Sequence, residues 1–135
     1  MADVGRLIVV GGGIGGYTAA IRAARSGIAT TLVEKGALGG TCLNVGCIPT
    51  KSLLHNARAY RNLLSWRVGR DGAVGHEPDL AHLMGEKDAA VSRLVRGVET
   101  LVKRNAITLV TGTAALDGPR SVRIVESGDV LEASS

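Results

Sequence analysis

Two cysteines five positions apart, Cys42 and Cys47, are the residues of this sequence best suited to chemistry. On a regular helix they would point about 140° away from each other, so a bridge between them needs a distorted turn. Gly46, directly before the second cysteine, gives the backbone that freedom. A strained and partly exposed bridge is of the labile, redox-active kind. The spacing therefore favours a catalytic disulfide.

The residues after the pair favour a thiolate at Cys47. Pro49 is typical of a first helical turn, so Cys47 lies just before a helix N-terminus, which stabilises negative charge. Lys51 adds a positive charge nearby. Three other interpretations stay open: a zinc site, inert buried thiols and a purely structural disulfide. Zinc usually has closer cysteine spacing, and no known pattern is completed by the histidines, which are His55, His76 and His82.

A second candidate site is the glycine run at residues 11–16, which contains the pattern G-x-G-x-x-G. A short apolar run predicts a buried strand over Arg6–Val10 before it, and the periodicity predicts a helix over residues 14–26 after it. A second strand is expected over Ala29–Glu34. Strand, glycine turn and helix in this order are the context that a dinucleotide-binding βαβ unit requires.

Each glycine of the pattern has a physical reason. Gly11 permits the tight turn, Gly13 lets the backbone approach a pyrophosphate, and Gly16 lets the helix pack close to the strand. The helix N-terminus then offers free N–H groups to the phosphates. Glu34 can accept hydrogen bonds from an adenosine ribose, and its charge would repel a 2′-phosphate, which argues against NADP. The turn does not distinguish NAD from FAD, and a glycine-rich turn without a ligand stays the alternative.

The rest of the chain predicts an α/β fold. The remaining expected elements are a glycine-rich loop over residues 35–46, a helix over 49–64, an irregular segment over 65–77, a long amphipathic helix over Leu80–Arg104 capped by Asn105, a strand over 107–111 and a small C-terminal β-hairpin over 121–126 and 130–132. The apolar stripe of the long helix comprises Leu83, Met84, Val91, Leu94, Val95, Val98, Leu101 and Val102. This pattern predicts a Rossmann-like domain with a parallel but incomplete sheet.

Composition limits the classes of function. The 135 residues suit one domain, and 45% hydrophobic with 21% charged residues indicates a folded rather than a disordered chain. The net charge of +4 comes from cations spread at helical spacing without interleaved aromatic residues, which argues against nucleic-acid binding. No stretch approaches the length of a transmembrane helix, so we expect a cytoplasmic protein without a membrane partner.

Residues 39–51, Gly-Gly-Thr-Cys-Leu-Asn-Val-Gly-Cys-Ile-Pro-Thr-Lys, resemble the redox signature of the pyridine nucleotide–disulfide oxidoreductase family. Leu43 and residues 48–51 look more like the dihydrolipoamide dehydrogenase type than the glutathione or mercuric reductase type. The resemblance is strong over about residues 4–60, weak through the long helix and present again at residues 112–114. A related flavin disulfide reductase and a stand-alone flavin or thiol-redox module stay the alternatives. Ile14 departs from the proline or alanine of many members.

The resemblance implies FAD as the cofactor. The residues expected to bind it are Gly11, Gly13 and Gly16 at the pyrophosphate, Glu34 at the ribose, and Lys35, Gly40, Thr41, Lys51 and Ala114. Cys47 would lie against the flavin, Cys42 would exchange with the substrate, and Lys51 would tune the flavin electrostatically. No metal is expected.

The resemblance also implies an activity for a longer protein. Dihydrolipoamide, carried by the lipoyl domain of a 2-oxo acid dehydrogenase complex or a glycine cleavage system, would reduce the Cys42–Cys47 disulfide, and the electrons would pass to FAD and then to NAD. The full-length enzyme is expected to be a homodimer. Members of the family are several times longer, so residues 1–135 are expected to be the N-terminal part of the FAD-binding domain without the NAD and dimerisation domains. The fragment alone is expected to be inactive.

Overall fold

The computed structural model describes residues 5–65 and 77–134, which form two small sheets and four helices. The predicted irregular segment over 65–77 lies almost entirely outside the described residues. The strands are β1 (Arg6–Val10), β2 (Ala29–Glu34), β3 (Thr108–Thr111), β4 (Ala114–Leu116), β5 (Ser121–Ile124) and β6 (Val130–Glu132). The helices are α1 (Ile14–Arg25), α2 (Gly40–Asn44), α3 (Cys47–Ser65) and α4 (Leu80–Arg104).

The first sheet is parallel and has the strand order β1-β2-β3. Arg6 pairs with Ala29 and Thr31 pairs with Thr108, so all three strands end at the same edge as the glycine turn. Central strands of parallel sheets are apolar because both faces are covered. In the central strand β2, Leu32 is fully buried and Val33 is nearly so. The predicted parallel βαβ unit is confirmed.

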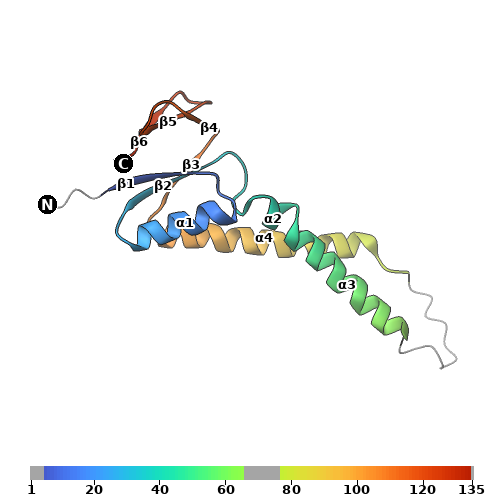
Figure 1. Ribbon diagram of the computed structural model, residues 1–135. Helices are drawn as coiled ribbons and strands as arrows, with labels where there is room; N and C mark the ends of the chain where they lie inside the picture. The colour runs from blue at the N-terminus through green and yellow to red at the C-terminus, as the bar shows by residue number, and fades with distance from the viewer. Residues whose placement is uncertain (1–4, 66–76, 135) are drawn as a thin grey trace.

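Helices α1 and α4 lie on one face of this sheet, and the small second sheet lies on the other side (Figure 1). On α1, Ala20 is fully buried, and the partly buried residues Tyr17, Ile21 and Ala24 pack against the same core. These four residues are the face that the sequence predicts for this helix. The core continues into α4 through Val98 and Val102.

The loop predicted over residues 35–46 is wrong in its second half, where α2 forms over Gly40–Asn44. Propensity argues against a helix there because glycine is a poor helix former. Tertiary contacts override it: Leu43 is buried, and the Asn44 amide donates hydrogen bonds to the carbonyls of Leu38 (3.1 Å) and Gly40 (2.9 Å). Helix α3 starts at Cys47, two residues before the predicted start near Pro49.

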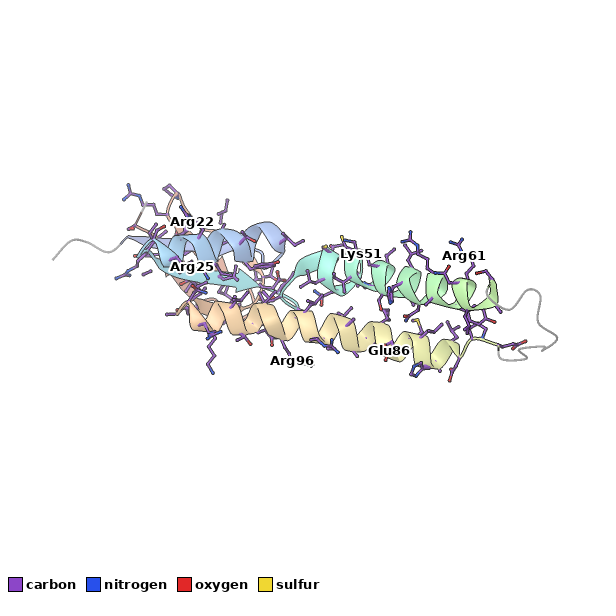
Figure 2. The ribbon with its side chains drawn as sticks, turned by 90° about the horizontal axis from the view of Figure 1, so that it is seen from below. Arg22, Arg25, Lys51, Arg61, Glu86 and Arg96 are labelled. Atoms are coloured by element: carbon purple, nitrogen blue, oxygen red, sulfur yellow. The ribbon has the colours of Figure 1, made fainter. Side chains whose placement is uncertain are left out.

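The long helix α4 has the predicted bounds, with Asn105 as its C-cap and the Asp79 side chain capping its N-terminus. Figure 2 shows it running alongside α1 at one end and α3 at the other. The second sheet is antiparallel with the order β4-β5-β6. The predicted hairpin is β5 and β6, and the sequence missed β4, whose three residues are too short to show a period. Among the described residues, no helix is long and apolar enough to cross a membrane.

Candidate functional site

The glycine turn between β1 and α1 has the geometry that its pattern predicts. Gly11 has φ of +96°, and its N–H donates to the Val33 carbonyl at 2.8 Å, which continues the sheet into the turn. A Cβ on Gly16 would lie 1.7 Å from the Gly11 carbonyl oxygen, so only glycine allows this approach of helix to turn. The first N–H groups of α1 have no partner within the helix and can bind an anion.

The second glycine cluster meets the first one at Gly13. Gly13 forms a parallel bridge with Gly39, whose N–H donates to the Gly12 carbonyl at 2.8 Å. A Cβ on Gly40 would lie 2.8 Å from the Gly13 Cα, so the two backbones touch because both residues lack side chains. The fold thus brings together two predicted cofactor residues, Gly13 and Gly40, that are 27 positions apart in the sequence. The N-terminus of α2 is thereby fixed beside the N-terminus of α1.

Glu34 lies at the end of β2 and binds the backbone of the turn. Its Oε2 accepts the Gly12 N–H at 2.6 Å, and its Oε1 accepts the Gly36 N–H at 2.8 Å. Each carboxylate oxygen can accept more than one hydrogen bond, so acceptor capacity is left for a ribose. Glu34 therefore both holds the turn and offers an acceptor at its rim.

A pocket of about 240 Å³ opens beside this carboxylate. The residues lining it are Val10, Gly11, Val33, Glu34, Lys35, Gly112, Thr113 and Ala114. Four of them are predicted cofactor residues from three separate stretches of the sequence: Gly11, Glu34, Lys35 and Ala114. The apolar ends of β1 and β2 and the backbone of residues 112–114 form walls that suit a flat base, and the glycine turn and Glu34 suit the phosphates and the ribose.

The two cysteines lie next to each other as free thiols, Cys42 in α2 and Cys47 as the first residue of α3. The pKa of the Cys42 thiol is raised, chiefly by its hydrogen bond with Cys47 and then by partial burial. The positive charge of Lys51 acts in the opposite direction and is the smaller effect. Cys42 is therefore the member of the pair that favours its protonated form.

Gly46 makes the contact of the two thiols possible. A Cβ there would lie 2.9 Å from the Thr41 carbonyl oxygen and 3.4 Å from the Cys42 Cα. The break between α2 and α3 is therefore the distorted turn that the cysteine spacing requires. Lys51, one turn into α3, lies on the side of the helix turned away from α4 (Figure 2).

Comparison with known proteins matches residues 5–134 to the family model described as pyridine nucleotide-disulphide oxidoreductase. The chain belongs to this family. It is 47% identical over 125 residues to the mitochondrial dihydrolipoyl dehydrogenase of Pisum sativum, covering 91% of the chain and 25% of that protein. It is 46% identical over 121 residues to the dihydrolipoyl dehydrogenase of Trypanosoma brucei brucei, covering 87% of the chain and 25% of that protein.

Among solved structures, the chain is similar to the HOCl-induced flavoprotein disulfide reductase RclA from Escherichia coli in its Cu(II) complex. The match has a TM-score of 0.74 at 26% identity and covers 98% of this chain and 26% of that one. The chain thus spans about a quarter of the length of the relatives that it matches. The resemblance found in the residues around the cysteine pair is confirmed at the level of the family.

Within this family member, the predicted residues fall into two groups. The first group lines the pocket and comprises Gly11, Glu34, Lys35 and Ala114. The second group is the cysteine pair with the neighbouring Lys51. The contact between Gly13 and Gly40 joins the two groups through the backbone. Thr41, which is exposed, lies in α2 next to Cys42. Among the described residues, no cluster of three or more histidine, cysteine or acidic side chains could hold a metal ion.

Thr113 lies in the stretch 112–114 where the resemblance is present again, but Glu126 behind this wall was not predicted from the sequence. Thr113 lines the pocket, and its N–H donates to the Glu126 carboxylate at 2.8 Å. Glu126 had no visible signal because it is an ordinary exposed charge at the end of the strand predicted over 121–126, and the observed strand β5 ends earlier, at Ile124. Gly112, directly after a strand, was the available hint for a close backbone approach at this wall.

Proposed function

We propose that this chain is the N-terminal, FAD-binding part of a dihydrolipoamide dehydrogenase, in which electrons pass from dihydrolipoamide through the Cys42–Cys47 pair and FAD to NAD. The observation that carries the proposal is the contact of the two thiols at the N-terminus of α3, fixed through Gly40 to the dinucleotide turn. The names of the relatives with 42–47% identity support this type within the family, among them proteins of pea, thale cress and a trypanosome.

The residues present fit FAD. The pyrophosphate would lie at the N-terminus of α1 over Gly13, the ribose against Glu34, and the adenine in the pocket between β2 and residues 112–114. Lys51 and Thr41 would face the flavin end beside Cys47. FAD, when bound, supplies a two-electron acceptor next to the thiol pair.

The thiol pair would carry out the exchange in two steps. One thiolate of dihydrolipoamide attacks the Cys42 sulfur of the oxidised pair, so a mixed disulfide forms and Cys47 leaves as a thiolate. The second thiol of the substrate attacks the mixed disulfide, so lipoamide leaves oxidised and Cys42 leaves reduced. The substrate loses two electrons and the cysteine pair gains them. Of the two substrate protons, one stays on Cys42, whose raised pKa favours the thiol, and the other is released.

The assignment of the two cysteines is tested by single substitutions in the purified, flavin-containing protein. Cys42→Ser should leave Cys47 as a thiolate beside the oxidised flavin and produce a long-wavelength absorption band at neutral pH. Cys47→Ser should lack this band. Finding the band only in the Cys47→Ser protein would reverse the assignment, and a protein purified without flavin would contradict the proposed function.

The substrate is tested separately by comparing dihydrolipoamide with reduced glutathione as electron donors to NAD. In the full-length protein, the proposal expects turnover with dihydrolipoamide and none with glutathione, while residues 1–135 alone should show no turnover with either donor. A glutathione- or mercury-specific activity would favour another flavin disulfide reductase of the same family, for which the similarity to RclA is the available support. The lipoyl domain of a multienzyme complex as partner and a homodimeric state belong to the same proposal and are tested by pull-down and by light scattering.

A further inference from the structure

The segment Gly112–Thr113–Ala114 joins the two sheets and forms one wall of the pocket. On one side it is tied to the parallel sheet, because the Gly112 N–H donates to the Glu34 carbonyl at 3.0 Å. On the other side it enters β4, whose Ala114 pairs with Ile124 of β5. The position of this wall therefore depends on how the antiparallel ladder ends next to Thr113.

Glu126 closes the ladder at that point with its side chain. The Val125 N–H donates to the Thr113 carbonyl at 2.9 Å, as an antiparallel pair requires. The Thr113 N–H, which in a continued ladder would donate to the Val125 carbonyl, donates instead to the Glu126 Oε2 at 2.8 Å. The hydrogen bond from the Thr113 hydroxyl, followed by the backbone hydrogen bond, lowers the pKa of Glu126. One carboxylate thus fixes the backbone of a pocket residue.

Gly112 leaves the space in which this carboxylate lies. A Cβ on Gly112 would lie 2.9 Å from the Glu126 Oε2 and 2.6 Å from the Ile124 Cγ2. The φ of +155° at Gly112 is also disfavoured for a residue with a side chain. The glycine and the carboxylate therefore fit together, and a side chain at position 112 would displace Glu126 or Ile124.

We propose that Glu126 is a positioning residue for the dinucleotide, which holds residues 112–114 in place against the adenosine half of the ligand. This inference rests on the proposed function, because it assumes that the pocket takes the adenosine of FAD. Glu126 itself does not line the pocket. Its effect is transmitted through Thr113, while Glu34 on the opposite rim acts on the ligand directly.

The test measures the affinity of the flavin-depleted protein for FAD and for ADP in the wild type and three variants. Glu126→Ala should weaken both ligands about tenfold, the effect of losing hydrogen bonds to a charged group. Glu126→Gln keeps an acceptor oxygen and should recover most of that loss. Asp129→Ala is the matched control, since this carboxylate lies on the same hairpin and, within the part of the chain that the structure describes, accepts a hydrogen bond from the Ser127 hydroxyl alone.

The possible outcomes separate the two proposals. A wild-type protein that binds neither FAD nor ADP contradicts the proposed function, and the role of Glu126 falls with it. A wild type that binds FAD while Glu126→Ala binds it within twofold of that affinity overturns only the role of Glu126. Weaker FAD binding with unchanged ADP binding also overturns it, because the wall faces the adenosine half. If the alanine variant does not fold, Glu126→Met, which keeps the length of the side chain without an acceptor oxygen, takes its place with the same expected loss of FAD and ADP binding.

Discussion

The two ends of this molecule differ in how completely they are packed. At the sheet end, formed by the parallel strands, α1 and the last turns of α4, Leu32 and Ala20 are fully buried. In the helical arm, formed by α3 and the first half of α4, no residue of α3 is buried. Apolar side chains of the arm that are 39–68% exposed are Leu54, Leu63, Leu64, Leu80 and Met84.

Helix α4 contains both buried and exposed apolar residues. The apolar stripe of α4 is regular along its length, but its buried residues are Val98 and Val102, which face the sheet. Met84, Leu94 and Leu101 of the predicted stripe are 39–43% exposed. An amphipathic period determines that a helix forms, while burial depends on what lies opposite each turn. The dinucleotide turn therefore belongs to the sheet end, which contains the buried core, and the thiol pair lies where the two ends meet.

The largest expected effect is at Gly16. In Gly16→Ala the new Cβ would meet the Gly11 carbonyl oxygen, so the loss in free energy of unfolding should be on the order of 4 kcal/mol or more. The adjacent Gly15 has nothing within 4 Å of its Cβ position, so Gly15→Ala should be neutral or stabilising by up to about 1 kcal/mol. Urea denaturation of both variants measures the difference. Equal stability of the two variants would contradict the close packing of α1 against the turn at Gly16.

The second largest effect is expected when one leucine from each end is replaced and the losses in stability are compared. Leu32→Ala removes a fully buried side chain and should cost about 3 kcal/mol. Leu63→Ala removes a side chain that is 55% exposed and should cost less than about 0.5 kcal/mol. Thermal and urea unfolding provide the values. A large loss at Leu63 would mean that the arm is covered by another surface in the protein that was measured.

A smaller effect is expected at the junction of the two ends. Gly46→Ala brings a Cβ to 2.9 Å from the Thr41 carbonyl, which should cost about 2 kcal/mol and separate the two thiols. Gly85→Ala in the arm has open space and is the control, with an expected gain below about 1 kcal/mol. Besides stability, the rate of disulfide formation between the cysteines is measured with an oxidised dithiol. An unchanged rate in Gly46→Ala would contradict the role given to this glycine.

The smallest effect is a pH dependence at Glu126. Its pKa is lowered in the folded protein, so its contribution to stability is present above about pH 4.5 and is lost as the pH falls through the folded-state pKa. The unfolding midpoints of wild type and Glu126→Gln should therefore differ at pH 7 and converge on acidification. A difference that stays constant down to pH 3 would show that the ionised carboxylate is not what holds Thr113.

Most of the fold followed from local patterns. The bounds of β1, β2 and α4 agree with their periodicity, and α1 ends one residue before the expected position. Two elements could not be found in this way. Helix α2 contains a glycine that propensity disfavours and forms because Leu43 is buried and Asn44 binds two carbonyls. Strand β4 is short and is defined by its pairing with β5.

For the site, the sequence by itself determined the residue types and their local geometry: the glycines of the turn, the acid at the end of β2, and the pair of cysteines around Gly46. These features depend on neighbours within a few positions, so a pattern can show them. Only the tertiary structure decided that Gly13 touches Gly40 and that Glu126 binds Thr113 beside the pocket. Such contacts join stretches of chain that only the folded arrangement brings together, and their partners leave no periodic or compositional signal.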